Sequence, residues 1–178
     1  MALLRDLFVE MLREMYGAEK GQIAALPAMS RAATTDELEN LFDEHLAQTE
    51  EHVYRLQRVF KMIGDEPGAK TSEAMAGLVR EAGGLSAETE NGSMTRDVAL
   101  IAAAQKIEHY EMAVYGTLVQ LASNMHLNEV AGLLEQTLRE EKEADMQLTE
   151  VAERYVNWQA LENENGGGYI RPLAETNR

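Results

Sequence analysis

The sequence of 178 residues contains no cysteine, only three prolines and few aromatic residues. Without cysteine there can be no disulfide, no thiolate metal site and no cysteine catalysis. Any transition metal must therefore be held by carboxylates and imidazole, a donor set that favours iron, manganese or zinc over copper(I). The scarcity of proline suits long uninterrupted helices, and an aromatic content of 6% is low for a sheet protein.

Basic residues and long apolar runs are also scarce. The chain has 16 Lys and Arg against 31 Asp and Glu, a formal net charge of -15. A nucleic-acid-binding surface needs a basic footprint, so we expect no nucleic-acid partner. No apolar run reaches the ~18 residues of a membrane span, and the N-terminal stretch MALLRDLFVEMLREMYG lacks the apolar core of a signal peptide. We therefore expect no membrane segment and a cytoplasmic location.

Apolar residues, in contrast, are plentiful and regularly spaced. Hydrophobic residues make up 45% of the chain, and in four long segments they recur at helical spacing. This spacing predicts helices over about residues 3–30, 36–63, 95–123 and 128–156. Short breaks separate the first helix from the second and the third from the fourth, so each pair is expected to form an antiparallel hairpin.

Local signals predict where two of these helices begin. Thr34, with Glu37 three residues later, has the pattern of a capping box before the second helix. Asn128 is expected to cap the fourth helix. Pro27 is expected to kink the first helix or to hasten its end.

The remaining segments decide the connectivity. Residues 64–94 are too long and too loosely patterned for a tight turn, so we interpret them as a crossover that carries a short helix near 72–81. Two hairpins joined by one long crossover are typical of ferritin-like bundles. The prediction is therefore an all-α, ferritin-like four-helix bundle over residues 1–157. A polar, Gly-rich tail is predicted over residues 158–178.

The third predicted helix carries carboxylates on a face that is otherwise apolar or small. Glu108 lies in the middle of that face, and Glu111 lies beside it. Burying an ionised carboxylate is costly unless a cation or a partner compensates its charge. A metal ion is therefore the first candidate for a positive charge in the core.

Polar residues on the inward faces of all four predicted helices fall at one depth when counted from the hairpin breaks. These residues are Glu19, Gln48, His52, Glu108, Glu111, Glu141 and Asp145. Gln48 and His52 are four residues apart, and Glu141 and Asp145 repeat that spacing, which places each pair on one helix face. A carboxylate-bridged dinuclear site takes one Glu from each of two helices and a paired motif from each of the other two. We therefore predict a site for two metal ions, with iron expected first and manganese or zinc as alternatives.

Several of these side chains also have simpler explanations. Glu19 could pair with Lys20 or with an arginine on a wet flank. His45, which shares the inward face of the second helix, is explained equally well as a hydrogen-bonded core histidine or as a ligand or support for one. Glu141 and Asp145 lie within the charged run REEKEAD, and such runs are usually solvated.

Four stretches of the chain carry a family resemblance. They are GAEK at 17–20, HLAQTEEHVYRL at 45–56, RDVALIAAAQKIEHYEMAVYGTL at 96–118 and LREEKEADMQLTEVA at 138–152. The chain resembles the bacterial YciE/YciF-type ferritin-like proteins over about residues 3–152. The resemblance implies a rubrerythrin-like four-helix fold, a dinuclear metal centre and a link with stress responses.

The same resemblance implies roles for individual residues. The acidic core positions of the family fall on Glu19, Glu108, Glu141 and Asp145, with Glu111 beside them. His45 matches a histidine found at that place, whereas Gln48 stands where members often have Glu. Because an amide is a weaker ligand than a carboxylate, one metal position is expected to be weak. The usual Glu-x-x-His pair is absent from the second and fourth predicted helices.

These observations lead to two main functional hypotheses. In the first, the protein is a dinuclear iron or manganese protein that lets oxygen or peroxide react at open coordination positions in stress protection. In the second, it is a non-catalytic helical oligomer with a degenerate metal site that acts through its surface, which Gln48 and the missing Glu-x-x-His pairs favour. Passive metal binding without turnover is a third hypothesis. A homodimer is expected because such bundles often associate through a helix face.

Overall fold

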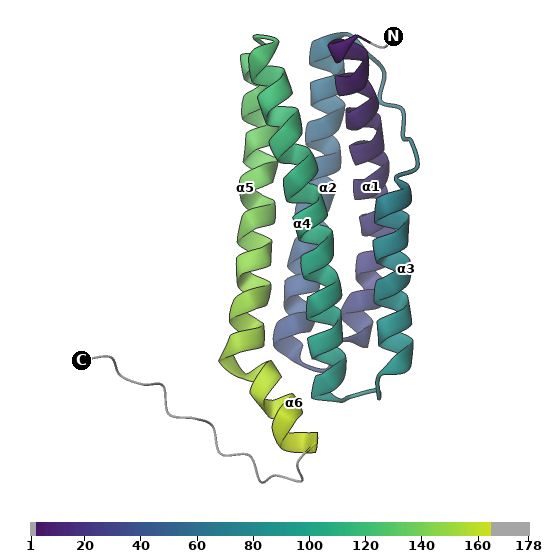
Figure 1. Cartoon of the computed structure of the whole chain (residues 1–178), viewed down its shortest axis with the longest axis vertical. Helices are drawn as coiled ribbons and strands as arrows, with labels where there is room; N and C mark the ends of the chain where they lie inside the picture. The colour runs from purple at the N-terminus through teal and green to yellow at the C-terminus, as the bar shows by residue number, and fades with distance from the viewer. Residues whose placement is uncertain (1–2, 165–178) are drawn as a thin grey trace, which may run out of the picture.

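The computed structural model describes residues 3–164, and within this range the chain is helical with no strand. The elements are α1 (Leu4–Ala32), α2 (Asp36–Ile63), α3 (Glu73–Glu88), α4 (Met94–Asn124), α5 (Asn128–Val151), the π-helical turn η1 (Ala152–Val156) and α6 (Asn157–Glu164). Helices α1, α2, α4 and α5 run side by side along the long axis, and α3 lies outside them against α1 and α4 (Figure 1). The prediction of an all-α bundle with a long crossover is confirmed.

The turn between α1 and α2 is held by a carboxylate from another helix. The buried side chain of Asp97, in the first turn of α4, accepts hydrogen bonds from the backbone N–H groups of Thr34 at 2.6 Å and Thr35 at 3.0 Å. Thr35 caps α2, because its hydroxyl oxygen accepts from the N–H of Leu38 at 3.3 Å. The predicted capping box at Thr34 and Glu37 is therefore wrong by one residue.

Other helix ends also differ from the prediction. The N-cap of α5 is Leu127, and Asn128 is already the first helical residue, so the predicted cap at Asn128 is wrong. Helix α1 continues past Pro27 to Ala32. At the same end of the bundle, α6 continues the chain through Asn157–Glu164, so the segment predicted as a tail begins as a helix (Figure 1). The rest of that predicted tail, residues 165–178, lies outside the described residues.

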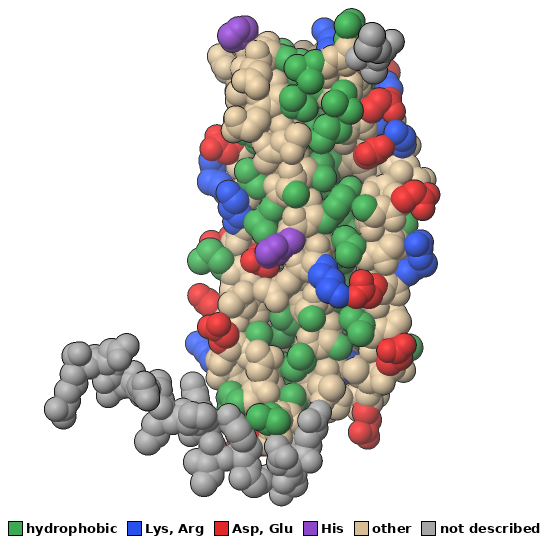
Figure 2. Space-filling view, viewed as in Figure 1, with side chains coloured by type: hydrophobic (Ala, Val, Ile, Leu, Met, Phe, Trp, Pro, Cys, Tyr) green, Lys and Arg blue, Asp and Glu red, His purple; other side chains and the backbone are tan. Residues whose placement is uncertain are grey.

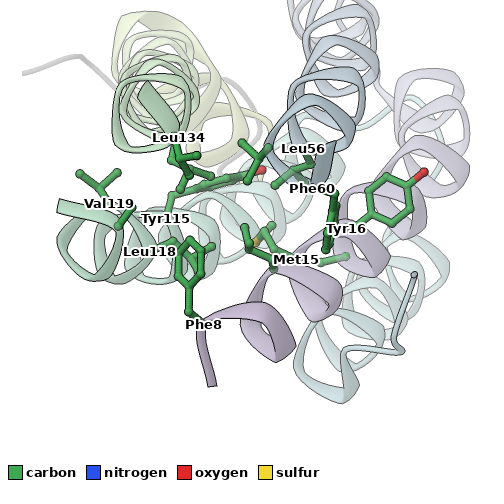
Figure 3. Packing of buried hydrophobic residues seen from close by; sticks show 14 of the residues in the cluster. Phe8, Met15, Tyr16, Leu56, Phe60, Tyr115, Leu118, Val119 and Leu134 are labelled. Atoms are coloured by element: carbon green, nitrogen blue, oxygen red, sulfur yellow. The ribbon is translucent and has the colours of Figure 1, made fainter. Parts of the chain in front are cut away.

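The apolar core consists of two clusters at different heights in the bundle. Figure 3 shows the first cluster, in which α1, α2, α4 and α5 contribute Phe8, Met15, Tyr16, Leu56, Phe60, Tyr115, Leu118, Val119 and Leu134. The second cluster includes Leu26, Met29, Leu38, Phe42, Leu100, Ile101, Leu148 and Val151. On α1, α2 and α5, buried polar residues lie between the parts that belong to the two clusters, and on α4 Glu108 and Glu111 lie between Ile107 and Tyr115 of the first cluster. The core is therefore apolar, then polar, then apolar along the bundle axis.

None of the helices within residues 3–164 combines the length and the apolar character that crossing a membrane requires.

Candidate metal centre

The polar layer in the middle of the bundle is built by all four long helices. Its carboxylates and imidazoles are Glu19 from α1, His45 and His52 from α2, Glu108 and Glu111 from α4, and Glu141 from α5. All six side chains are buried, and Glu19, His52, Glu111 and Glu141 are 0% exposed. Apolar clusters above and below this layer separate it from solvent, so its charges interact in a medium of low dielectric.

The six side chains form two groups that share one residue. In each group, candidate ligand atoms lie within 4.8 Å of one another. The first group, called here the His45 position, comprises His45, Glu108, Glu111 and Glu141. The second group, called the His52 position, comprises Glu19, His52 and Glu141. Glu141 therefore belongs to both positions, as a bridging carboxylate would.

The distances show that Glu141 directs one oxygen to each side. Its Oε1 lies 3.0 Å from Nδ1 of His52, and its Oε2 lies 3.9 Å from Nε2 of His45. Nε2 of His45 is also 3.3 Å from Oε1 of Glu108, and Nδ1 of His52 is 3.6 Å from Oε1 of Glu19. Two separate sets of donor atoms thus converge on either side of one carboxylate.

Many of these donor atoms have no hydrogen-bond partner among the described residues. They are Oε2 of Glu19, Oε2 of Glu108, both oxygens of Glu111 and Oε2 of Glu141, whereas Oε1 of Glu141 faces Nδ1 of His52. Native proteins satisfy nearly all buried polar groups, so such a concentration needs a physical explanation. Two divalent cations would satisfy these atoms, and their charge would balance the four buried carboxylates. The donor set of carboxylates and imidazoles fits iron, manganese or zinc.

The protonation behaviour of these groups follows from burial and from their mutual contacts. Burial raises the pKa of Glu19, and it raises the pKa of Glu108 and Glu111 well above the ordinary value of 4.5. Burial opposes ionisation of Glu141 as well, but the contact with His52 outweighs it and lowers the pKa of Glu141. For His52, burial favours the neutral ring, yet the facing carboxylates Glu141 and Glu19 raise its pKa to about 11. Without metal, protons therefore compensate part of the buried negative charge.

His52 is oriented by a carboxylate outside the two groups. Its Nε2 lies 2.9 Å from Oε2 of Glu140, a half-exposed residue next to Glu141. Arg55 donates to both oxygens of Glu140, at 2.8 and 3.2 Å, and to the hydroxyl of Thr137 at 2.5 Å. With Nε2–H donated to Glu140, Nδ1 is the nitrogen that faces the centre, and a metal ion would take the place of the proton that Nδ1 carries in the metal-free protein. Outer carboxylates commonly orient metal-binding histidines in this way.

His45 and Glu19 have supporting contacts of their own. Nδ1 of His45 lies 3.4 Å from Oε1 of Gln48, a contact that leaves Nε2 as the nitrogen facing the centre. The side-chain amide nitrogen of Gln22 lies 3.0 Å from that Nε2. The hydroxyl of the fully buried Tyr115 donates to Oε1 of Glu19. Gln48 and Tyr115 thus support His45 and Glu19 from outside the centre, whereas Gln22 contacts the His45 nitrogen that faces it.

Comparison with known proteins places the chain in a family. Residues 3–161 match the family described as Domain of unknown function (DUF892). The chain belongs to this family. Protein YciF of Escherichia coli (strain K12) is 40% identical to this DUF892 chain over 164 residues, which cover 90% of the chain and 96% of YciF. The resemblance to YciE/YciF-type proteins is confirmed.

Solved structures agree on the fold of this DUF892 chain. The crystal structure of the E. coli stress protein YciF matches with a TM-score of 0.81 and 37% identity, covering 93% of this chain and 99% of YciF. YcfI from Rhodopseudomonas palustris matches with a TM-score of 0.81 and 35% identity, covering 83% of this chain and 94% of YcfI. A two-domain Anabaena variabilis protein with a ferritin-like domain matches with a TM-score of 0.54 and 13% identity, covering 99% of this chain and 42% of that protein. At this level of identity the match shows the fold alone.

The structure brings together most of the predicted ligands. Within the two groups lie the predicted residues Glu19, His52, Glu108, Glu111 and Glu141. His45, predicted as a ligand or as a support for one, is placed among the candidate ligands themselves. Gln48 is half-buried and contacts His45 instead of joining either group. Helix α2 thus presents two histidines seven residues apart, and not the predicted pair Gln48 and His52.

Asp145 is a predicted ligand whose contacts lie outside the two groups. Its Oδ1 lies 3.3 Å from the side-chain nitrogen of Gln105 and 3.4 Å from Nε2 of His109, whose side chain is 66% exposed. Neither of the two groups includes Asp145. A residue four positions after Glu141 is rotated by about 40° around the helix, and here that rotation points Asp145 toward the flank of α4.

Sequence reasoning missed the supporting residues Gln22, Arg55, Tyr115 and Glu140 as a set. One signal existed for Gln22, because it follows Glu19 by three residues just as Glu111 follows Glu108. Glu140 is hidden in a charged run, and its ion pair with Arg55 joins two helices that are far apart in sequence. No local pattern distinguishes such a pair.

Proposed function

We propose that this DUF892 chain binds two divalent metal ions, iron before manganese or zinc, in a carboxylate-bridged centre at the His45 and His52 positions. One observation supports the proposal above all others. Glu141 is fully buried, and its two oxygens face two different groups of donor atoms, with Oε1 3.0 Å from Nδ1 of His52 and Oε2 3.9 Å from Nε2 of His45.

The proposed activity is a reaction with dioxygen or peroxide in stress protection. When bound, a pair of iron ions would supply redox chemistry and open coordination positions. The protein residues provide the setting. Glu141 would offer one oxygen to each position, Glu140 holds His52 in one orientation, and Tyr115 holds Glu19. The adjoining apolar clusters exclude water from the layer. The related E. coli protein is described as a stress protein, which supports this role by similarity.

Metal content per chain tests the proposal directly. Wild-type protein, loaded with Fe(II) without oxygen and analysed by elemental mass spectrometry, is expected to retain about two irons per chain. The Glu141→Gln variant is expected to lose most of this iron, because the bridge is removed from both positions. Glu143→Gln is the matched control, since Glu143 is an exposed carboxylate on the same helix. A folded wild-type protein that binds no Fe(II), Mn(II) or Zn(II) would contradict the proposal.

A non-catalytic role with a degenerate metal site is the second candidate function. It is favoured by the ligand count, since the His52 position has only three protein donors and Gln48 supplies no carboxylate to either position. The two functions differ in turnover. Iron-loaded protein that consumes dioxygen or peroxide repeatedly supports the first, whereas metal that binds and stays inert supports the second.

A homodimer in the cytoplasm remains part of the proposal. On the face shown in Figure 2, apolar side chains lie along the middle from top to bottom, and most charged side chains lie near the two long edges. A charge-poor surface is the easiest one to bury between two chains that each carry a net charge of -15. Light scattering of the full chain is expected to give the mass of two chains.

A further inference from the structure

An apolar pocket connects the surface of the bundle with one of the two metal positions. All four long helices line the pocket. Its residues on α1 and α4 are buried, whereas Glu44, Gln48 and Gln147 on α2 and α5 are exposed or half-exposed. The pocket therefore opens between α2 and α5. Its walls are formed largely by Leu26, Phe42, Ala104, Ile107, Ala144 and Leu148.

The inner end of this pocket reaches only one side of the centre. His45 and Glu108 line it, and both belong to the His45 position. Glu19 and His52 do not line it, and both are 0% exposed. The two metal positions, which share Glu141, are therefore unequal in access. One lies at the end of a passage, and the other is enclosed by packed side chains.

The size and the lining of the pocket restrict what can pass. Its cavity volume of about 20 Å³ is slightly more than one water-sized molecule needs. Polar residues lie at the mouth of the pocket and at its inner end, but the apolar wall between them, which includes Leu26, Phe42 and Leu148, offers no group that replaces an ion's hydration shell. A polar molecule would likewise lose hydrogen bonds to water at the level of Leu26, Phe42 and Leu148. A small apolar molecule meets neither penalty.

We propose that this pocket admits a small apolar molecule of the size of dioxygen to the His45 position. This inference adds to the proposed function the class of the reactant and the side from which it enters. It rests on the proposed function only for the reaction that the molecule would undergo at the metal centre. Organic substrates and hydrated ions are excluded by the volume. The pocket itself is a property of the protein without metal, so binding to it can be tested separately.

Xenon, an apolar atom that occupies such cavities, is the probe for the first experiment. Metal-free full-length protein is expected to bind xenon in the pocket, with shifts of the methyl signals of Ala104, Ala144 and Leu148 in NMR spectra. Ala144→Leu fills the pocket and is expected to abolish these shifts, whereas Ala113→Leu, at an exposed site on α4, is the control and leaves them unchanged. No xenon-induced shift in the wild type, or shifts that persist in folded Ala144→Leu, would overturn the proposal.

A second measurement needs no variant and uses dioxygen itself. Dissolved dioxygen is paramagnetic and speeds the relaxation of the methyl protons that it approaches. In metal-free wild type, the methyls of Ala104 and Ala144 are expected to relax faster than those of Leu12 and Leu56, which are buried in the other apolar cluster. If dioxygen sped the methyl relaxation of Ala104, Ala144, Leu12 and Leu56 equally, the proposal would be overturned. Failure to bind metal would leave both of these results unaffected, so the two proposals fail separately.

Discussion

Glu141 is the residue on which the proposed centre depends most. It carries one of the four buried carboxylates of the polar layer, and it alone belongs to both groups of donor atoms. The pKa values around it show how the metal-free protein accommodates this charge. Glu108 and Glu111 hold protons more tightly than ordinary carboxyls, whereas His52 stays protonated against Glu141. These protons occupy the place that metal ions would take.

Glu140 acts through His52, so its removal should weaken metal binding without unfolding the protein. Glu140→Gln keeps the shape of the side chain but loses the charge that holds Nε2–H of His52 and pairs with Arg55. We expect metal affinity to fall roughly 10–100-fold, as for other outer carboxylates of metal-binding histidines. Calorimetric titration with Mn(II) or Zn(II) measures the change, which should affect one of two sites. Unchanged binding at both sites would show that His52 needs no such support.

The raised carboxyl pKa values make metal stabilisation dependent on pH. A carboxyl whose pKa is raised on folding stabilises the metal-free protein below about pH 4.5, and this contribution is lost as the pH rises. Metal must displace the protons of Glu108 and Glu111, so its apparent affinity increases with pH. The difference in Tm between loaded and metal-free protein is therefore expected to be larger at about pH 7.5 than at about pH 5.5. Calorimetry at both pH values measures these differences in Tm, and equal differences would contradict the prediction.

At the scale of single elements, the crossover is anchored on α1 through a close backbone approach. The N–H of Lys70 donates to the carbonyl oxygen of Arg13 at 3.0 Å, and a Cβ at Gly17 would lie only 2.0 Å from the carbonyl oxygen of Lys70. A glycine at position 17 is therefore required for the contact between α1 and the segment that precedes α3. The same contact keeps α3 against α1 and α4 (Figure 1).

Paired glycine variants on α1 test this anchor. Gly17→Ala forces the crossover away from α1 and is expected to lower the free energy of unfolding by about 1–3 kcal/mol. Gly21→Ala is the matched control, since its Cβ would meet only the Met75 side chain at 4.0 Å. That change should be neutral or stabilising by up to about 1 kcal/mol, because alanine favours a helix. Denaturant unfolding of both variants gives the comparison, and a Gly17→Ala protein as stable as Gly21→Ala would refute the anchor.

At the scale of the whole molecule, the bundle places its most costly residues in its centre. Four long helices bury carboxylates between two apolar clusters, where unpaired charge opposes folding. Residues of this kind are retained for function at a cost in stability. Metal binding should therefore stabilise the folded protein by RT ln(1 + [L]/Kd), about 2.7 kcal/mol when the metal is 100-fold above Kd.

The Glu111→Gln variant separates the two effects on stability, namely the cost of burying a carboxyl and the gain from metal binding. Near neutral pH Glu111 must take up a proton to be buried, and glutamine needs none, so the metal-free variant should be more stable than wild type by about 1 kcal/mol or more. The stabilisation added by metal should shrink at the same time, because the His45 position loses a carboxylate. Thermal unfolding of wild type and variant, each with Mn(II) and with a chelator, measures both changes. A variant that is less stable than wild type in the presence of chelator would mean that Glu111 has a structural partner.

The sequence by itself determined the number of long helices, their connectivity and the depth of the polar layer. Each of these depends on local regularities, namely the spacing of apolar residues and the position of the breaks. Glu19, Glu108 and Glu141 were predicted correctly as inward residues for this reason, since all three are buried. The carboxylates of Glu108 and Glu111 already indicated a compensating cation.

Only the tertiary structure decided which side chains meet. Spacing within one helix fixes relative directions at about 100° per residue, but not how that helix is rotated against its neighbours. That rotation is set by packing across helices in the two apolar clusters. It turns His45 and His52 inward, leaves Gln48 at the pocket wall and directs Asp145 to the flank. The division of the ligands into two positions around Glu141 arises from these contacts between helices.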